Sequence, residues 1–174
     1  MFNLDLQISE FFFELGRALP LGIVNFLATY LFWILVVLVI FISLKNHAPR
    51  FILFMYAATS GLIVYYINKV IGFYFFRERP YISLGFENLL GEVHPDKSFP
   101  SDHTSLAWTM ALMVFLYNKK YGVFLLAIAL LVSISRILAG VHYISDILGG
   151  IVVGTIIALF VYWLTKRSWI KKYL

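Results

Sequence analysis

Residues 23–44 read IVNFLATYLFWILVVLVIFISL, a run of 22 residues without a single charged side chain. A helix needs about 20 mostly apolar residues to cross a bilayer. The whole chain shares this character, because 61% of its 174 residues are hydrophobic and only 13% are charged. Its mean hydropathy is +0.87. Soluble domains contain about 45–50% apolar and 25% charged residues, so we predict an all-α integral membrane protein.

Four further apolar segments complete a prediction of five transmembrane helices, the first at about Ile23–Leu44 and the others at about Phe51–Phe76, Ser101–Tyr117, Gly122–Ala139 and Asp146–Leu164. The third and fourth segments are short and need flanking residues or local burial to span. No linker, internal repeat or low-complexity stretch interrupts the chain. We therefore predict one domain over residues 1–174.

The segment before the first span has a different pattern. Apolar residues recur there at helical spacing, with charged residues between them: Leu4, Ile8, Phe11, Phe12 and Leu15 against Asp5, Glu10, Glu14 and Arg17. A signal peptide would begin with basic residues and lack these acids. We predict that residues 1–20 form an amphipathic helix that lies in the membrane interface.

Loop charges predict the orientation in the cell membrane. With the amino terminus outside, the cytoplasmic pieces are residues 45–50, 118–121 and the basic tail 165–174, which can bind anionic lipid headgroups. These pieces hold eight of the fourteen Lys and Arg residues and none of the nine Asp and Glu residues. This asymmetry follows the positive-inside rule. The net charge of +5 thus reflects membrane topology, and nucleic acid is not a predicted partner.

Three polar clusters remain, and the predicted topology brings all of them to the outer face. They are RERP at residues 77–80, PSDH at residues 100–103 and SRILAGVHYISD at residues 135–146. Any single Arg or His at a helix end is commonly an anchor or a structural residue. Ionisable residues that gather on one face of a membrane protein are candidates for function.

These residue types suit phosphoryl transfer. Arg79 and Arg136 offer guanidinium groups for bidentate binding of phosphate oxygens, and Arg77 is a third candidate. Ser101 follows a proline at a predicted helix start, where free backbone N–H groups favour an anion.

Two histidines and one carboxylate complete the predicted chemistry. His142 and Asp146 are four residues apart, and they share a face if the fifth helix begins by His142. A carboxylate on one ring nitrogen fixes the tautomer and leaves the other nitrogen as a nucleophile. His103 is then a second imidazole that can protonate a leaving oxygen.

At these residues the chain resembles the type 2 phosphatidic acid phosphatase (PAP2) superfamily. The last family motif is Ser-Arg, five residues, His, three residues, Asp, which residues 135–146 match in type and spacing. The middle motif is usually Pro-Ser-Gly-His, and Asp102 stands here in place of the glycine. The first motif is Lys, six residues, then Arg-Pro, and Gly72 occupies its lysine position. The resemblance covers residues 68–150, about half of the chain.

The missing lysine leaves alternatives open. Lys69 lies three residues before Gly72, about 60° round a helix, and either Lys69 or Arg77 replaces the cation, or nothing does. Lys97 and His94 are assigned to the loop surface. The PSDH variant and the absent lysine resemble a bacterial branch that includes the bacitracin-resistance undecaprenyl diphosphate phosphatases.

The resemblance implies a role for each matched residue. His142 would attack phosphorus to form a phosphohistidine, Asp146 would orient it, and His103 would protonate the leaving group. The phosphate would be held by Arg79, Arg136 and Ser101, with backbone N–H groups near Asp102 and with Arg77 as a further candidate. The family needs no cofactor, and the sequence places no cluster of ligands at metal-binding spacing.

The family also implies a bundle of six helices with an outward-facing site, which five spans and an interfacial helix would fit. The expected substrate is undecaprenyl diphosphate, hydrolysed to the monophosphate. The alternatives are a phosphatase for phosphatidylglycerol phosphate or phosphatidic acid, and a non-enzymatic lipid-binding protein with a degraded site. In the loop 77–100, Phe86, Leu89, Leu90 and Val93 are expected either to contact lipid headgroups or to pack internally. The sequence predicts no oligomeric state.

Overall fold

The computed structural model describes residues 2–44, 48–91 and 97–167. All regular secondary structure in these ranges is helical, which confirms the predicted all-α class. The elements in chain order are α1 (Phe2–Ala18), α2 (Leu21–Asn25), the π-helix η1 (Phe26–Tyr30), α3 (Leu31–Leu44), α4 (Ala48–Tyr74), α5 (Pro80–Ser83), α6 (Asp102–Tyr117), α7 (Lys119–Leu138) and α8 (Ile144–Arg167).

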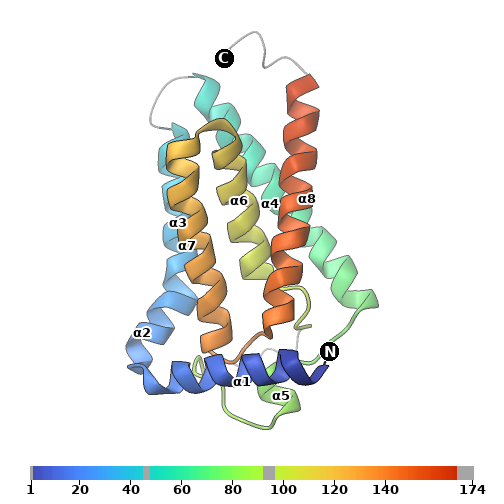
Figure 1. The fold of residues 1–174 in the computed structure, drawn as a ribbon. Helices are drawn as coiled ribbons and strands as arrows, with labels where there is room; N and C mark the ends of the chain where they lie inside the picture. Colours follow the sequence, from blue (N-terminus) through green and yellow to red (C-terminus); the bar gives the residue numbers. More distant parts are fainter. Residues whose placement is uncertain (1, 45–47, 92–96, 168–174) are drawn as a thin grey trace.

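Five long helices form a bundle, and α1 crosses one end of it (Figure 1). We call this end the α1 end. The central helix α6 packs against α3, α4, α7 and α8. With 16 residues it is only about 24 Å long. Because its neighbours surround it with protein, a short helix with buried polar residues is tolerated at this position.

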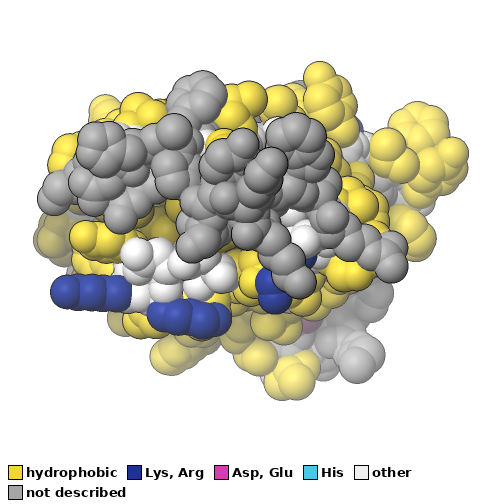
Figure 2. Space-filling view, turned by 90° about the horizontal axis from the view of Figure 1, so that it is seen from above, with side chains coloured by type: hydrophobic (Ala, Val, Ile, Leu, Met, Phe, Trp, Pro, Cys, Tyr) yellow, Lys and Arg dark blue, Asp and Glu magenta, His cyan; other side chains and the backbone are white. Residues whose placement is uncertain are grey.

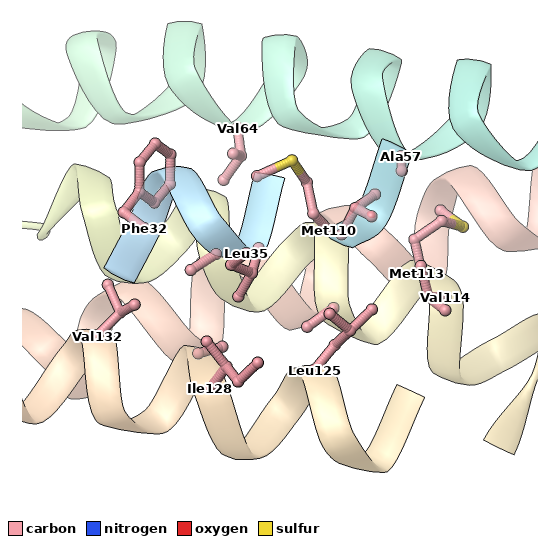
Figure 3. Close-up of a cluster of buried hydrophobic side chains, with 14 of the residues drawn as sticks. Phe32, Leu35, Ala57, Val64, Met110, Met113, Val114, Leu125, Ile128 and Val132 are labelled. Atoms are coloured by element: carbon pink, nitrogen blue, oxygen red, sulfur yellow. The ribbon is translucent and has the colours of Figure 1, made fainter. Parts of the chain in front are cut away.

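Apolar side chains fill the space between these helices (Figure 3). Leu35, Val64, Met113 and Leu125 come from four different helices and are all fully buried. The outside of the bundle is apolar as well: Trp33, for example, is 62% exposed. A helix that is hydrophobic all round fits a membrane-spanning segment, so the outer surface suits a lipid environment.

Three helical segments are long and apolar enough to cross a membrane: Leu21–Leu44, Lys119–Leu138 and Ile144–Lys166. The protein is therefore a membrane protein, as predicted. Helices α4 and α6 occupy the other two predicted spans, but neither is among the segments that qualify by length and composition. The count of five spans, like the single domain, stays a prediction.

The amino-terminal helix α1 packs against α7 and α8. Its Phe13 ring stacks on Phe86 at a centroid distance of 4.1 Å, while Leu4 and Phe11 remain exposed. The helix thus presents apolar side chains both to the bundle and away from it. Its location in the membrane interface stays a prediction.

The loop that follows α4 returns across the α1 end. Its Phe86, Leu89 and Leu90 pack against an apolar cluster that includes Val24 and Ala139, which favours internal packing over contact with headgroups. Val93 and His94 lie outside the described residues.

The opposite end of the bundle carries the turn between α6 and α7 and the carboxyl end of α8. Figure 2 looks down on this end, where Lys and Arg side chains lie beside hydrophobic and other side chains. Lys119 and Lys120 begin α7, and Lys166 lies at the end of α8. The predicted cytoplasmic tail lies largely beyond the described residues, as does Lys45.

Candidate active site

His142 lies in the turn between α7 and α8, and Asp146 lies in the first turn of α8. Gly140 has a φ of +74°, which favours glycine, and a Cβ there would lie 2.7 Å from the Phe13 ring. The condition that the fifth helix begins by His142 is not met, because α8 begins at Ile144, close to the predicted start of the span at about Asp146. The turn itself places His142 Nδ1 3.4 Å from Asp146 Oδ2.

Three donors hold the Asp146 carboxylate, which is fully buried. Ser98 Oγ donates to Oδ2 at 2.5 Å, the Tyr143 N–H donates to Oδ2 at 2.8 Å, and Arg77 Nη1 lies 3.2 Å from Oδ1. A carboxylate held in this way can accept the Nδ1–H of His142, which leaves the lone pair on Nε2. Among the described residues, no hydrogen bond occupies His142 Nε2.

Sequence reasoning missed Ser98, which also lies 3.5 Å from His142 Nδ1. Its backbone N–H donates to Arg77 O at 2.7 Å, so the loop is fixed to the segment after α4 at this point. Ser98 falls two residues before the middle motif, and a lone serine there gives no signal of its own.

The environment of His142 keeps its imidazole neutral. Burial lowers the pKa of His142 from 6.5 to about 4, although Asp146 opposes the shift. The positive charges of Arg79 and Arg136 lower it further. A neutral imidazole with a fixed tautomer is the form that can attack an electrophile.

The two predicted phosphate-binding arginines approach this histidine from different segments. Arg79 precedes α5 and is 8% exposed, and its Nη1 lies 3.4 Å from Val141 O. Arg136 lies in the last turn of α7 and donates through Nη1 to Ala28 O at 2.8 Å. Ala28 belongs to η1, and a π-helical turn often occurs at a functional site. The structure brings both cations to the α1 end beside His142.

Arg77 occupies a different place from the other two arginines. Its guanidinium contacts Asp5 Oδ2 of α1 at 2.7 Å and Ser145 Oγ at 2.6 Å, and it lies 3.5 Å from the centre of the Tyr143 ring. Together with its contact to Asp146, these interactions join α1 to the start of α8. Asp5 also accepts the Ser145 N–H at 3.0 Å. This link through α1 was not predicted.

Ser101 is the N-cap residue of α6, as predicted. Its N–H donates to Asp146 O at 3.1 Å, so the start of α6 is fixed to the start of α8. The hydroxyls of Ser101 and Thr104 are buried and have no hydrogen-bond partner among the described residues. A buried hydroxyl normally has a partner, and a phosphate oxygen at this helix start would supply one.

The next two residues of the motif point to different partners. The Asp102 carboxylate accepts a hydrogen bond from Asn68 Nδ2 at 2.9 Å through Oδ1. The His103 ring packs edge-on against Phe32 with centroids 5.1 Å apart. His103 lies in the first turn of α6, and the start of α6 lies at the same end of the bundle as the turn between α7 and α8 (Figure 1).

The assignment of Lys97 to the loop surface is wrong. Its side chain is 8% exposed, and its ammonium donates to Pro100 O at 2.7 Å and to Asp102 Oδ1 at 3.0 Å. Two departures from the family motifs could have indicated its role: the lysine of the first motif is absent, and the middle motif carries an acid at position 102 that needs a cation. Among the described residues, no three His, Asp or Glu side chains form a group that could hold a metal ion.

Comparisons with known proteins place this site in a family. Residues 50–170 match the PAP2 superfamily. The bacitracin transport permease protein BcrC of Bacillus licheniformis is 33% identical over 167 residues, which cover 95% of this chain and 82% of that protein. The chain therefore belongs to the PAP2 superfamily and is an enzyme of its phosphatase class, as predicted.

Two further relatives are consistent with this assignment. The undecaprenyl-diphosphatase BcrC of Bacillus subtilis is 37% identical over 103 residues, covering 59% of this chain and 53% of that protein. The crystal structure of a transmembrane PAP2-type phosphatidylglycerolphosphate phosphatase from Bacillus subtilis aligns with a TM-score of 0.60 at 23% identity, covering 99% of this chain and 88% of that one. The latter similarity concerns the fold.

Proposed function

We propose that this membrane phosphatase hydrolyses undecaprenyl diphosphate to undecaprenyl phosphate through a phosphohistidine on His142. The observation that carries the proposal is the placement of the buried His142, held at Nδ1 by Asp146 beside Arg79 and Arg136, where burial lowers its pKa to about 4. A charged diphosphate needs cations to bind and a nucleophile that is not itself protonated, and this arrangement supplies both.

In the proposed reaction, His142 Nε2 attacks the terminal phosphorus, and the bond from phosphorus to the bridging oxygen breaks. His103 gives its proton to that oxygen as the lipid monophosphate leaves. Water then attacks the phosphohistidine, His103 takes a proton from the water, and inorganic phosphate is released. Arg79, Arg136, Ser101 and the backbone N–H groups at the start of α6 stabilise charge on the equatorial oxygens.

Relatives named for this activity support the choice of substrate, since one of them is an undecaprenyl-diphosphatase at 37% identity. We further propose that the site faces the outside of the cell membrane and that the carboxyl terminus is cytoplasmic. The distribution of basic residues in the loops supports this orientation.

The test is phosphate release by the detergent-purified protein with a chelator present. Undecaprenyl diphosphate is compared with phosphatidylglycerol phosphate and phosphatidic acid at equal mole fraction in the micelle. We expect the highest kcat/KM for the diphosphate and inhibition by orthovanadate. A preference for either glycerophospholipid would contradict the proposed substrate, and chelator-sensitive turnover restored by magnesium would contradict the metal-independent route.

A further inference from the structure

One face of α4 and the loop residue Lys97 fit together at the lysine position of the first motif. A Cβ added to Gly72 would lie 1.9 Å from Lys97 Cδ and 2.7 Å from both Cγ and Cε. The stem of Lys97 therefore fills the volume that any side chain at position 72 would need. Glycine at this position is explained by this close approach.

The ammonium of Lys97 lies at the start of α6. It donates to Pro100 O at 2.7 Å and to Asp102 Oδ1 at 3.0 Å. Asn68 donates to the same Asp102 oxygen at 2.9 Å, and Asn68 shares a helical face with Gly72 four residues later. Asn68 and Gly72 of α4 thus pack beside the ion pair between Lys97 and Asp102.

This pairing resolves an electrostatic conflict in the site. A carboxylate in the first turn of α6 would repel a phosphate that binds to the N–H groups of that turn. The buried ammonium of Lys97 neutralises the Asp102 carboxylate. Burial lowers the pKa of Lys97, and the charge of Asp102 opposes this shift. The positive charges of Lys69 and Arg79 lower the pKa of Lys97 further.

The two replacements considered from the sequence have other roles. Lys69 is exposed, and its Nζ lies 5.4 Å from the centre of the Tyr65 ring. Arg77 is bound to Asp5 and Asp146. Neither side chain has described contacts with Asp102 or with the start of α6.

We propose that Lys97 is the substrate-positioning cation that takes the place of the missing motif lysine, reaching the phosphate site through the gap left by Gly72 and neutralising Asp102. The proposal rests on the proposed phosphatase function. Under this proposal Gly72, Lys97 and Asp102 depend on one another, so a substitution at one of them lowers activity unless the others change to match.

The first test removes the charge and keeps the stem. Lys97→Met should lower kcat/KM on the order of 100-fold, the size expected for one preorganised group at a phosphate site. Lys69→Met, a matched loss of an exposed lysine, should leave it unchanged. Adding Asp102→Gly to Lys97→Met should raise kcat/KM at least about tenfold above that of Lys97→Met, because the unpaired carboxylate is removed. Activity of Lys97→Met within threefold of the unmodified enzyme would overturn the proposal.

The second test exchanges the positions. Gly72→Ala should lower activity in the unmodified enzyme and have no effect in Lys97→Ala, because the collision requires both side chains. The variant Gly72→Lys/Lys97→Ala/Asp102→Gly moves the cation to the motif position, and it should recover most of the activity lost in Lys97→Ala. Equal effects of Gly72→Ala in both backgrounds, or a triple variant no better than Lys97→Ala, would contradict the proposal.

A binding measurement separates this proposal from the choice of lipid. Orthovanadate should raise the melting temperature of the unmodified protein and of Lys69→Met, and it should raise that of folded Lys97→Met far less. Unchanged stabilisation of Lys97→Met by vanadate would refute the role of Lys97 whatever the lipid substrate is. A reduced vanadate response together with no turnover of undecaprenyl diphosphate by the unmodified protein would support Lys97 and reject only the substrate.

Discussion

The site has two corners that are built in different ways. The histidine corner (His142, Tyr143 and Asp146) comes from one continuous stretch of chain, the turn before α8 and the first turn of α8, and the backbone of this stretch sets its distances. The lysine corner (Gly72, Lys97 and Asp102) joins α4, a loop and α6, and its distances depend on how three separate segments pack. Local backbone geometry therefore sets the first corner, with support from Ser98 and Arg77, whereas the second should fail when any one segment moves.

The largest loss of activity is expected from a substitution within the histidine corner. Asp146→Asn keeps the shape of the side chain but removes the charge that selects the Nδ1–H tautomer and stabilises a cationic imidazole. We expect kcat to fall by about 10³–10⁴-fold, as for the equivalent change in a serine protease triad. Phosphate release measured at saturating substrate, with KM determined in parallel, checks this. A fall of less than tenfold in folded protein would show that the carboxylate does not act through His142.

Removing Ser98 tests the residue that connects the two corners. Ser98→Ala deletes one donor to Asp146 and should lower kcat about tenfold, since the carboxylate keeps the Tyr143 N–H and Arg77. Ser133→Ala is the matched control, because Ser133 is also buried but bonds only to Ala129 O in α7. Similar losses in the two variants would indicate a general packing effect instead.

A smaller effect is expected from the amino-terminal helix, which supports the histidine corner from outside. Asp5→Asn weakens the contacts to Arg77 and to the Ser145 N–H, so α1 should hold the start of α8 less firmly. We expect kcat to fall about threefold to tenfold and the melting temperature to fall with it. Glu14→Gln removes a carboxylate paired with Arg17 on the exposed side of α1 and should change neither quantity.

The pH dependence of stability tests the histidine corner in the unmodified protein. Because burial lowers the pKa of His142 to about 4, its imidazole should stay unprotonated in the folded protein down to about that pH. The unfolded chain takes up the proton near pH 6.5, so acidification from pH 6.5 to 4 favours unfolding, by up to about 3 kcal/mol.

The measurement is the melting temperature of the unmodified protein and of His142→Gln across this range. The unmodified protein should lose more stability than the variant as the pH falls. Parallel pH profiles would contradict a lowered pKa for His142.

The contrast between the corners also explains what the sequence could predict. The spacing of residues 135–146 predicted that His142, Asp146 and Arg136 lie near one another, because the end of α7, the turn after it and the start of α8 form one short stretch of chain. The predicted start of the fifth span, at about Asp146, is two residues after the observed start of α8 at Ile144. Ser101 was predicted as an N-cap residue because a helix start is a local property.

The remaining features depend on packing between distant segments. Lys97 was assigned to the surface because, although the acid at position 102 hints at a partner, no local pattern indicates that the loop folds back onto Gly72. Asp5 was placed on the polar side of an amphipathic helix, and the pattern could not show that this side faces Arg77. The conversion of residues 26–30 to a π-helix, whose Ala28 carbonyl accepts from Arg136, likewise has no local sequence signal.

The most direct test of the central claim is to trap the covalent intermediate. The purified enzyme is mixed with undecaprenyl diphosphate, quenched with base within the first turnover, and digested for mass spectrometry, because phosphohistidine survives base better than acid. We predict one phosphoryl group on His142, and none on the corresponding peptide of folded His142→Ala. Steady hydrolysis without phosphate on His142, or a phosphoryl group on another residue, would contradict the account.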